Sequence, residues 1–222
     1  VSEDYFFSIL PTTTQYSRNA IFSGLMPLDI DKKYPEKWFY DDENAGKNLH
    51  EEFFLNEQFK RNNISLKTSY TKITNHKSGK ELEDTILNLM NNDFNVIVYN
   101  FVDMLSHART EMEVLKELAS DEAAYRSLTL SWFDHSPLLN AIQKLKEKKV
   151  RIVITSDHGT MRVQNPSKII GDKATTTNLR YKTGRNLNFN EKEVFYVKNP
   201  EEAMLPKSNL SSSYVFAKED YY

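Results

Sequence analysis

Three runs of hydrophobic residues dominate the pattern of the chain: residues 5–10, 94–102 and 150–155. The second and third runs are almost continuously apolar and rich in β-branched residues, which is typical of strands that helices cover on both faces. Weaker strand patterns follow at 65–71, 194–197 and 214–217. We therefore expect three central strands and several shorter ones.

Helical patterns fall between these runs. Five segments carry a helical spacing of apolar positions: 15–23, 48–61, 80–91, 111–131 with a break inside it, and 137–148. Strands that alternate with helices predict an α/β fold, with a largely parallel sheet and helices on both faces. Residues 159–192 are polar and lack a period, so we expect a long loop or a small cap there. All of 1–222 is expected to form one domain.

Composition narrows the class of protein. With 39% hydrophobic and 12% aromatic residues among 222, the chain can fill a core. A formal net charge of -2 argues against nucleic-acid binding by bulk charge. The absence of cysteine excludes disulfides and thiolate metal sites and fits a reducing cytoplasm. No apolar run is long enough to cross a membrane, and the first residues do not resemble a signal peptide, so we expect a cytoplasmic protein without membrane insertion.

Each strong run ends in reactive side chains. The first is followed by "PTTT", the second by Asp103 with His107 four residues later, and the third by Asp157 and His158. In a doubly wound sheet the carboxyl ends of the strands meet at one edge, where ligands bind. Two Asp-His pairs and a hydroxyl at that edge predict a zinc site with oxygen and nitrogen ligands.

Each motif also has a structural interpretation. "DHG" is a common turn, and three threonines before a helix can be a strand end and an N-cap. "DMLSH" can be a helix N-cap followed by a surface histidine. Asp134 and His135 precede Pro137 at an expected helix start, so we assign them a structural role, and we expect His50 and His76 to face solvent.

The order of the motifs carries a family resemblance. A strand followed by "PTTTQYSRNAIFSGLMP", then "VDMLSH" and "ITSDHG", resembles the alkaline phosphatase superfamily, and the first motif is similar to its PglZ branch. "TTTNLRYKTGRNLN" resembles the PglZ domain of PorX-type response regulators of bacterial type IX secretion. The resemblance covers nearly the whole chain.

The resemblance implies a mechanism and its residues. Thr14 would be the nucleophile, with Thr13 and Thr12 as the nearest alternatives. The resemblance implies two zinc ions. Asp103 and His107 would supply part of the ligands of one ion. Asp157 and His158, together with Thr14, would supply part of the ligands of the other. Four cations would bind substrate phosphates: Arg18, Lys173, Arg180 and Arg185. A salt bridge is the alternative for Arg18, and a solvated flap is the alternative for the basic loop.

The family pattern includes an Asp on a strand before the nucleophile and a His near the end of the domain. We find no counterpart of either residue in this sequence. We interpret the chain as a partial domain that lacks N- and C-terminal elements. Zinc affinity depends on ligand number, so we expect these 222 residues alone to be metal-poor and inactive.

The resemblance implies a zinc-dependent phosphodiesterase that acts on nucleotide or oligonucleotide phosphodiesters, as the effector domain of a two-component regulator. Tyr181 could stack a base. The alternative is a non-catalytic signalling domain that keeps the fold and docks to regulatory partner proteins. A homodimer is an option.

Overall fold

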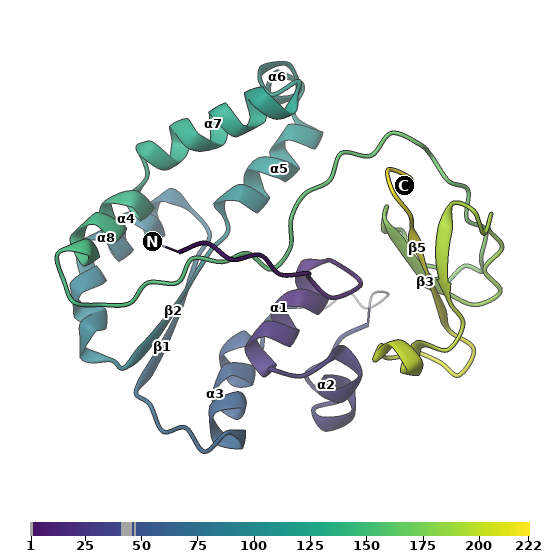
Figure 1. The fold of residues 1–222 in the computed structure, drawn as a ribbon, viewed down its shortest axis with the longest axis horizontal. Coiled ribbons are helices and arrows are strands. Elements are labelled where there is room, and N and C mark those ends of the chain that lie inside the picture. The colour runs from purple at the N-terminus through teal and green to yellow at the C-terminus, as the bar shows by residue number, and fades with distance from the viewer. Residues whose placement is uncertain (1, 41–45, 47) are drawn as a thin grey trace. The chain divides into compact units, whose positions relative to one another are not determined.

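The computed structural model describes residues 2–40, 46 and 48–222. They form two compact units, one of Val1–Ile64 with Ile154–Tyr222 and one of Ser65–Val153. Both units mix helices with small sheets, which Figure 1 shows with their labels. The α/β class of the fold is therefore confirmed.

The first unit combines three helices with an antiparallel sheet. Its helices are α1 (Thr14–Ser23), α2 (Pro27–Lys33) and α3 (Glu51–Arg61), and a short 3-10 helix covers Pro200–Ala203. The sheet has the order β3-β5-β4, with strands Tyr181–Gly184, Ser213–Ala217 and Val194–Val197. Aromatic side chains fill the unit: Tyr16 of α1 packs edge-on against Trp38, with ring centroids 5.3 Å apart, and against Tyr181, at 6.1 Å.

The sequence explains the ends of α1. Thr13 has extended backbone angles and stands directly before the helix. Gly24 ends the helix with a φ of 61°, the left-handed conformation that glycine adopts without strain, and its N–H donates to the Ala20 carbonyl. The predicted helix 15–23 is confirmed, and it places Thr14 in the first turn.

The second unit contains a parallel pair of strands. β1 (Thr68–Ile73) pairs with β2 (Phe94–Tyr99) in a register that runs from Thr68 opposite Phe94 to Ile73 opposite Tyr99. Between them lie α4 (His76–Thr85) and a 3-10 helix (Ile86–Asn91), and α8 (Pro137–Lys146) packs against both helices. Ile73, Leu82, Ile86 and Ala141 are the buried centre of this unit.

A chain of helices follows β2 in the second unit. Its members are α5 (Phe101–Glu111), α6 (Glu113–Leu118) and α7 (Glu122–Asp134). The predicted helix 111–131 is therefore broken, as expected, and begins later than its pattern suggested. The N-cap of α7 is Asp121, whose carboxylate accepts a hydrogen bond from the Ala124 N–H.

Two sequence predictions about the sheet are wrong for the described residues. Segments 5–10 and 150–155 are not β-strands, and the described strands form a two-stranded parallel and a three-stranded antiparallel sheet instead of one largely parallel sheet. The apolar side chains of these segments are exposed, with Phe7 at 103% and Val153 at 78%. Without a neighbouring strand, their backbone groups have no ladder to join.

The polar segment 159–192 is also more ordered than a simple loop. It contains β3, and the backbone of Thr176 and Thr183 is paired because the Thr176 N–H donates to the Thr183 carbonyl at 3.0 Å. Among the described residues no helix is both long and apolar enough to cross a membrane.

Candidate functional site

Thr14 faces His158 in the first unit. Its Oγ1 lies 3.3 Å from His158 Nε2, although 144 positions separate the two residues in the chain. Thr13 holds the N-cap position, yet its side chain makes no capping hydrogen bond, and its buried Oγ1 has no hydrogen-bond partner among the described residues. The side chain of Thr13, at the N-cap position, therefore does not cap α1.

His158 has one defined tautomer. Its Nδ1 lies 2.9 Å from the carbonyl oxygen of Gly159, and because a carbonyl can only accept, Nδ1 must carry the proton. In the neutral ring Nε2 then keeps a lone pair, which is directed at the Thr14 hydroxyl. A backbone carbonyl that fixes the far nitrogen in this way is usual for histidines that bind metals.

Asp157 completes a set of three donors. Its Oδ2 lies 3.6 Å from His158 Nε2. This distance is too long for a hydrogen bond, and the buried oxygen finds no such partner within the part of the chain that the structure describes. A lone pair on Nε2 and a carboxylate oxygen repel each other, so either a proton or a metal cation between them would be favourable.

The two known separations among these donors are compatible with the ligand spacing of a zinc ion. Ligand bonds of roughly 2.0–2.1 Å in a tetrahedral site place neighbouring ligand atoms about 3.3 Å apart. The separations from His158 Nε2 to Thr14 Oγ1 and to Asp157 Oδ2 are 3.3 and 3.6 Å, close to that value. No group of three or more His, Cys, Asp or Glu side chains is close enough to hold a metal in the described ranges, so the hydroxyl of Thr14 is needed as the third donor here.

Two serines connect this site to α1. Ser8 Oγ donates to the Asp157 carbonyl at 2.8 Å and lies 2.9 Å from Ser17 Oγ. Since the single hydroxyl proton of Ser8 is used on Asp157, Ser17 must donate to Ser8. Ser17 stands three positions after Thr14 on the same side of α1. The pair therefore sets the position of the Asp157–His158 turn relative to the helix that carries Thr14.

We expect Ser8→Ala to weaken zinc binding by about three- to tenfold, because the turn that carries both ligands loses its bond to α1, worth about 1 kcal/mol. Chelator competition would measure the affinity. Ser8→Thr keeps the hydroxyl and should restore binding, and the exposed Ser2→Ala is the control. Unchanged affinity in Ser8→Ala would contradict this role.

Asp103 and His107 lie in the second unit. They stand four positions apart on α5, with His107 Nε2 3.6 Å from Asp103 Oδ1. Both side chains are exposed, at 54% for Asp103 and 70% for His107. The spacing lets the pair contribute two ligands from one helix face, and their predicted role in a second zinc site stays a prediction.

The four cations predicted to bind substrate have different surroundings. Arg18 is buried and paired with Glu51. Arg180 donates to the Tyr221 carbonyl, and burial lowers its pKa. Arg185 Nε donates to Asp172 Oδ2 at 2.7 Å, and Lys173 is exposed. Substrate binding by these residues stays a prediction, but Arg18 has a structural task as well.

The Arg18–Glu51 pair lies in the interior, with Arg18 Nη2 2.6 Å from the carboxylate and Glu51 only 1% exposed. We expect Glu51→Ala to lower the free energy of unfolding by about 3 kcal/mol, because the buried guanidinium loses its countercharge. Denaturant unfolding measures the effect. Glu52→Ala, the same change at an exposed neighbour, should have little effect; an equal effect of both variants would refute the argument.

The remaining histidines were mostly predicted correctly. His135 Nδ1 bonds the Ser131 carbonyl, and Ser136 caps α8, so this motif is structural as expected. His76 is exposed. His50 is a correction: it is half-buried and stacked on Phe39, and burial lowers its pKa. The stack forms because the aromatic ring of Phe39 offers apolar surface that the imidazole covers.

The described residues thus combine a mixed α/β fold with a threonine hydroxyl at a helix start that faces an Asp-His pair, as an alkaline phosphatase-like domain would. The model of the family described as the BREX system PglZ alkaline phosphatase-like domain matches residues 1–221. The chain therefore belongs to the PglZ family, which confirms the resemblance at that level. No curated protein matches the chain.

Proposed function

We propose that the protein is a zinc-dependent phosphodiesterase of nucleotides or oligonucleotides, with Thr14 as nucleophile. The observation that supports it best is the position of His158 Nε2, which lies 3.3 Å from Thr14 Oγ1 and 3.6 Å from the buried Oδ2 of Asp157. Thr14 is also the first residue of α1, where free backbone N–H groups favour a phosphate. One place thus combines a nucleophile, metal ligands and an anion site.

The reaction would proceed in two displacements. Thr14 Oγ1 attacks phosphorus in line and releases its hydroxyl proton to solvent, while the bond to the leaving oxygen breaks and that oxygen takes up a proton from solvent. Water then attacks the phosphothreonine and releases phosphate monoester and the free hydroxyl. The Nδ1–H of His158, bonded to Gly159, keeps Nε2 available on the Thr14 side. Zinc, when bound, would lower the pKa of the hydroxyl and offset charge on the phosphoryl oxygens.

Hydrolysis of bis(p-nitrophenyl) phosphate by the protein that carries this domain tests the proposal. We expect zinc-dependent release of nitrophenol, lost on chelation and restored by zinc. No turnover by a zinc-loaded protein would overturn it. Mono- and dinucleotide substrates would then decide between small esters and oligonucleotides.

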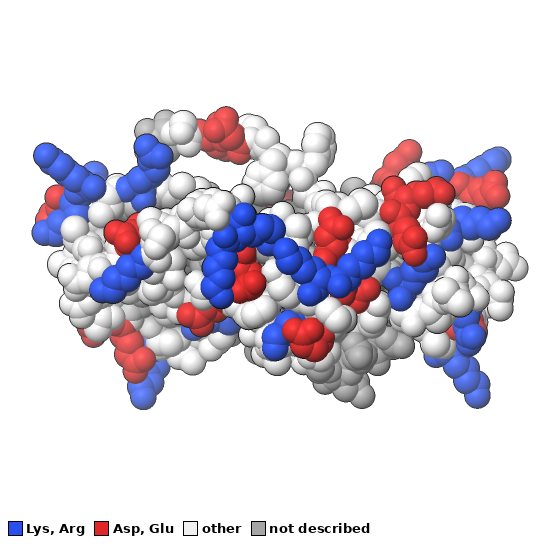
Figure 2. Space-filling model, turned by 90° about the horizontal axis from the view of Figure 1, so that it is seen from below, with Lys and Arg blue, Asp and Glu red and all other residues white. Residues whose placement is uncertain are grey.

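The surface charge places a limit on how a nucleic acid would bind. On the face that Figure 2 shows, Lys and Arg side chains lie interspersed with Asp and Glu over the described residues. A long duplex binds best to a broad basic surface. We therefore favour a mononucleotide or short oligonucleotide as substrate.

The regulatory context is part of the proposal. The motif from Thr175 to Asn188 supports an effector domain of a PorX-type two-component regulator of type IX secretion, acting in the cytoplasm with regulatory partners, and a homodimer is an option. The alternative function, a non-catalytic interaction domain, is favoured by the exposed apolar segment 5–10, where Tyr5 is 89% exposed. Partner binding that survives Thr14→Ala, without any turnover, would favour the alternative.

A further inference from the structure

A small polar pocket lies on the side of α1 away from Thr14. Thr14 and Tyr16 are two positions apart, so their side chains leave the helix on opposite sides. Thr14 faces His158, whereas Tyr16 packs toward Tyr181 and lines the pocket. The pocket is therefore separate from the proposed nucleophile within the same unit.

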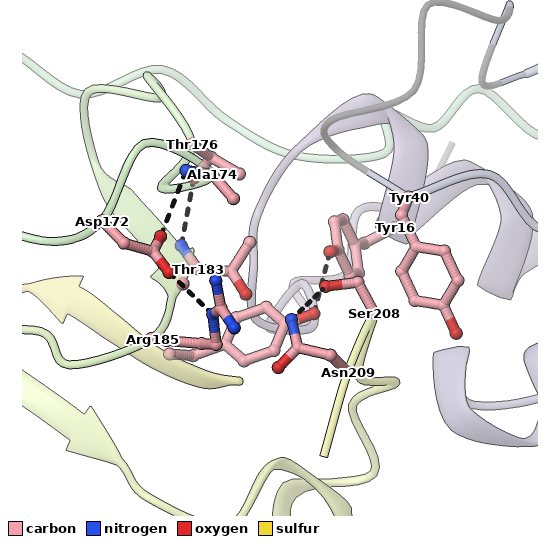
Figure 3. Close-up of a pocket in the computed structure, with 11 residues that line it drawn as sticks. Tyr16, Tyr40, Asp172, Ala174, Thr176, Thr183, Arg185, Ser208 and Asn209 are labelled. Atoms are coloured by element: carbon pink, nitrogen blue, oxygen red, sulfur yellow. Dashed lines mark hydrogen bonds and ion pairs between the residues drawn. The ribbon is translucent and has the colours of Figure 1, made fainter. Parts of the chain in front are cut away.

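Arg185 stands at the wall of this pocket in a fixed orientation. Figure 3 shows its guanidinium beside Asp172, where Nε donates to Oδ2 at 2.7 Å. The hydrogen bond from Arg185 is the largest of the effects that hold the pKa of Asp172 below its ordinary value. With Nε occupied, the two Nη groups remain for a ligand, because Asp172 is the one side chain among the described residues that Arg185 bonds.

The loop that carries Asp172 is fastened to the strand before Arg185. The Thr183 N–H donates to Thr176 Oγ1 at 3.0 Å, and the Thr176 N–H donates to the Thr183 carbonyl at the same distance. A Cβ at Gly184 would come within 3.1 Å of the Thr175 Cα, so the close approach requires glycine. Asp172 and Arg185 are thus held face to face by the backbone around them.

Polar groups from another segment form the opposite wall. Ser208 and Asn209 precede β5 and line the pocket, and the Asn209 amide lies 3.5 Å from Ser208 Oγ. The cavity holds about 20 Å³, close to the space that one bound water needs. One small polar group can enter, and a nucleobase cannot.

We propose that the mouth of this pocket is a second phosphoryl-binding site, in which the Nη groups of the half-exposed Arg185 bind a terminal phosphate and one phosphate oxygen enters the pocket toward Ser208 and Asn209. A guanidinium fork binds carboxylate and phosphate alike, but only a tetrahedral ion has further oxygens outside the plane of the fork for donors on a second wall. Asp172 lines the same pocket, but Arg185 and the Ala174 N–H already offset its charge. This refines the predicted substrate-binding role of Arg185, because its phosphoryl group is not the one that Thr14 attacks.

Phosphorus NMR titration of the chelator-treated, metal-free protein tests the site without any hydrolysis. Inorganic phosphate and adenosine monophosphate are the two probes, and acetate, added to the phosphate complex as a competitor, is the carboxylate control. We expect one phosphoryl group bound per chain, at least about tenfold weaker in Arg185→Gln and several-fold weaker in Ser208→Ala. Lys192→Gln removes one exposed cation elsewhere in the unit and should bind as the parent does.

Arg185→Lys separates fork geometry from charge. We expect it to bind almost as weakly as Arg185→Gln, because an ammonium cannot present two parallel donors. Parent-like binding in Arg185→Gln, or in Arg185→Lys, would overturn the proposal, as would preference for acetate. Binding of adenosine monophosphate but not free phosphate would identify a nucleotide as the source. Because Thr14 and zinc take no part, absence of hydrolysis would leave this result intact.

Discussion

Thr14→Ala is expected to lower the rate of phosphodiester hydrolysis at least about a thousandfold in the zinc-loaded protein, because it removes the attacking oxygen. The fold should survive. Thr14 is half-buried at the first position of α1, and its hydroxyl contacts His158 alone among the contacts described for the side chain. Loss of such a group costs about 1 kcal/mol, typical of a helix-start hydroxyl. Steady-state rates and thermal unfolding would be measured side by side.

Thr12 and Thr13 supply matched controls for this change. Thr12 is exposed, so Thr12→Ala should retain the parent rate. Thr13 carries the N-cap backbone and a buried Oγ1 without a hydrogen-bond partner among the described residues. Activity that persists in Thr14→Ala and vanishes in Thr13→Ala would move the nucleophile by one residue. Activity that persists in both would remove covalent catalysis from the proposal.

The helices could be predicted from the sequence because their signals are local. Ser136 and Pro137 mark the start of α8, and Gly24 marks the end of α1. A cap and the 3.6-residue period lie within a few turns of each other, so one segment contains the whole signal. Two helices were missed. Helix α2, Pro27–Lys33, is short and carries too few apolar positions to show a period. Helix α5, Phe101–Glu111, begins inside the apolar run 94–102, whose strand ends at Tyr99 and is therefore shorter than predicted.

The strands were harder because pairing depends on a second segment. The pattern at 150–155 is strongly strand-like, yet the segment is extended without a ladder, and Ile154 is 75% exposed. The weaker pattern at 65–71 does pair, as β1, because β2 lies parallel to it in register. The preference of side chains for a β-strand can be recognised from one segment of the sequence. The strand that pairs with that segment is determined by the tertiary structure.

The reactive residues of the candidate site could be predicted from the sequence, but the residues that position them could not. Thr14, Asp157 and His158 follow from reactive residues after apolar runs, and the structure brings these three together. Ser8 was missed, although a lone hydroxyl inside the apolar run 5–10 is a usable signal. Asp172, which orients Arg185, could not be found because its partner is 13 positions away across a loop without a period.

Asp157→Asn is expected to weaken zinc binding at the Thr14 site by at least about a hundredfold, because it removes a charged ligand from a site with few of them. Its effect on stability should have the opposite sign. Oδ2 of Asp157 is buried without a hydrogen-bond partner among the described residues, so the metal-free protein holds an uncompensated charge. A neutral amide lowers that desolvation penalty and should raise the free energy of unfolding by about 1 kcal/mol.

Chelator competition gives the zinc affinity of parent and variant, and denaturant unfolding of both metal-free proteins gives the stability. Zinc should then stabilise the parent against unfolding and leave Asp157→Asn nearly unchanged, since a ligand stabilises only the state that binds it. Asp4→Asn, the same charge change at an exposed position, controls for net charge. A variant that is less stable without metal yet binds zinc as the parent does would show that Asp157 is a structural residue. The two opposite signs follow from one cause: a carboxylate oxygen that is buried without a partner destabilises the protein until a cation binds it.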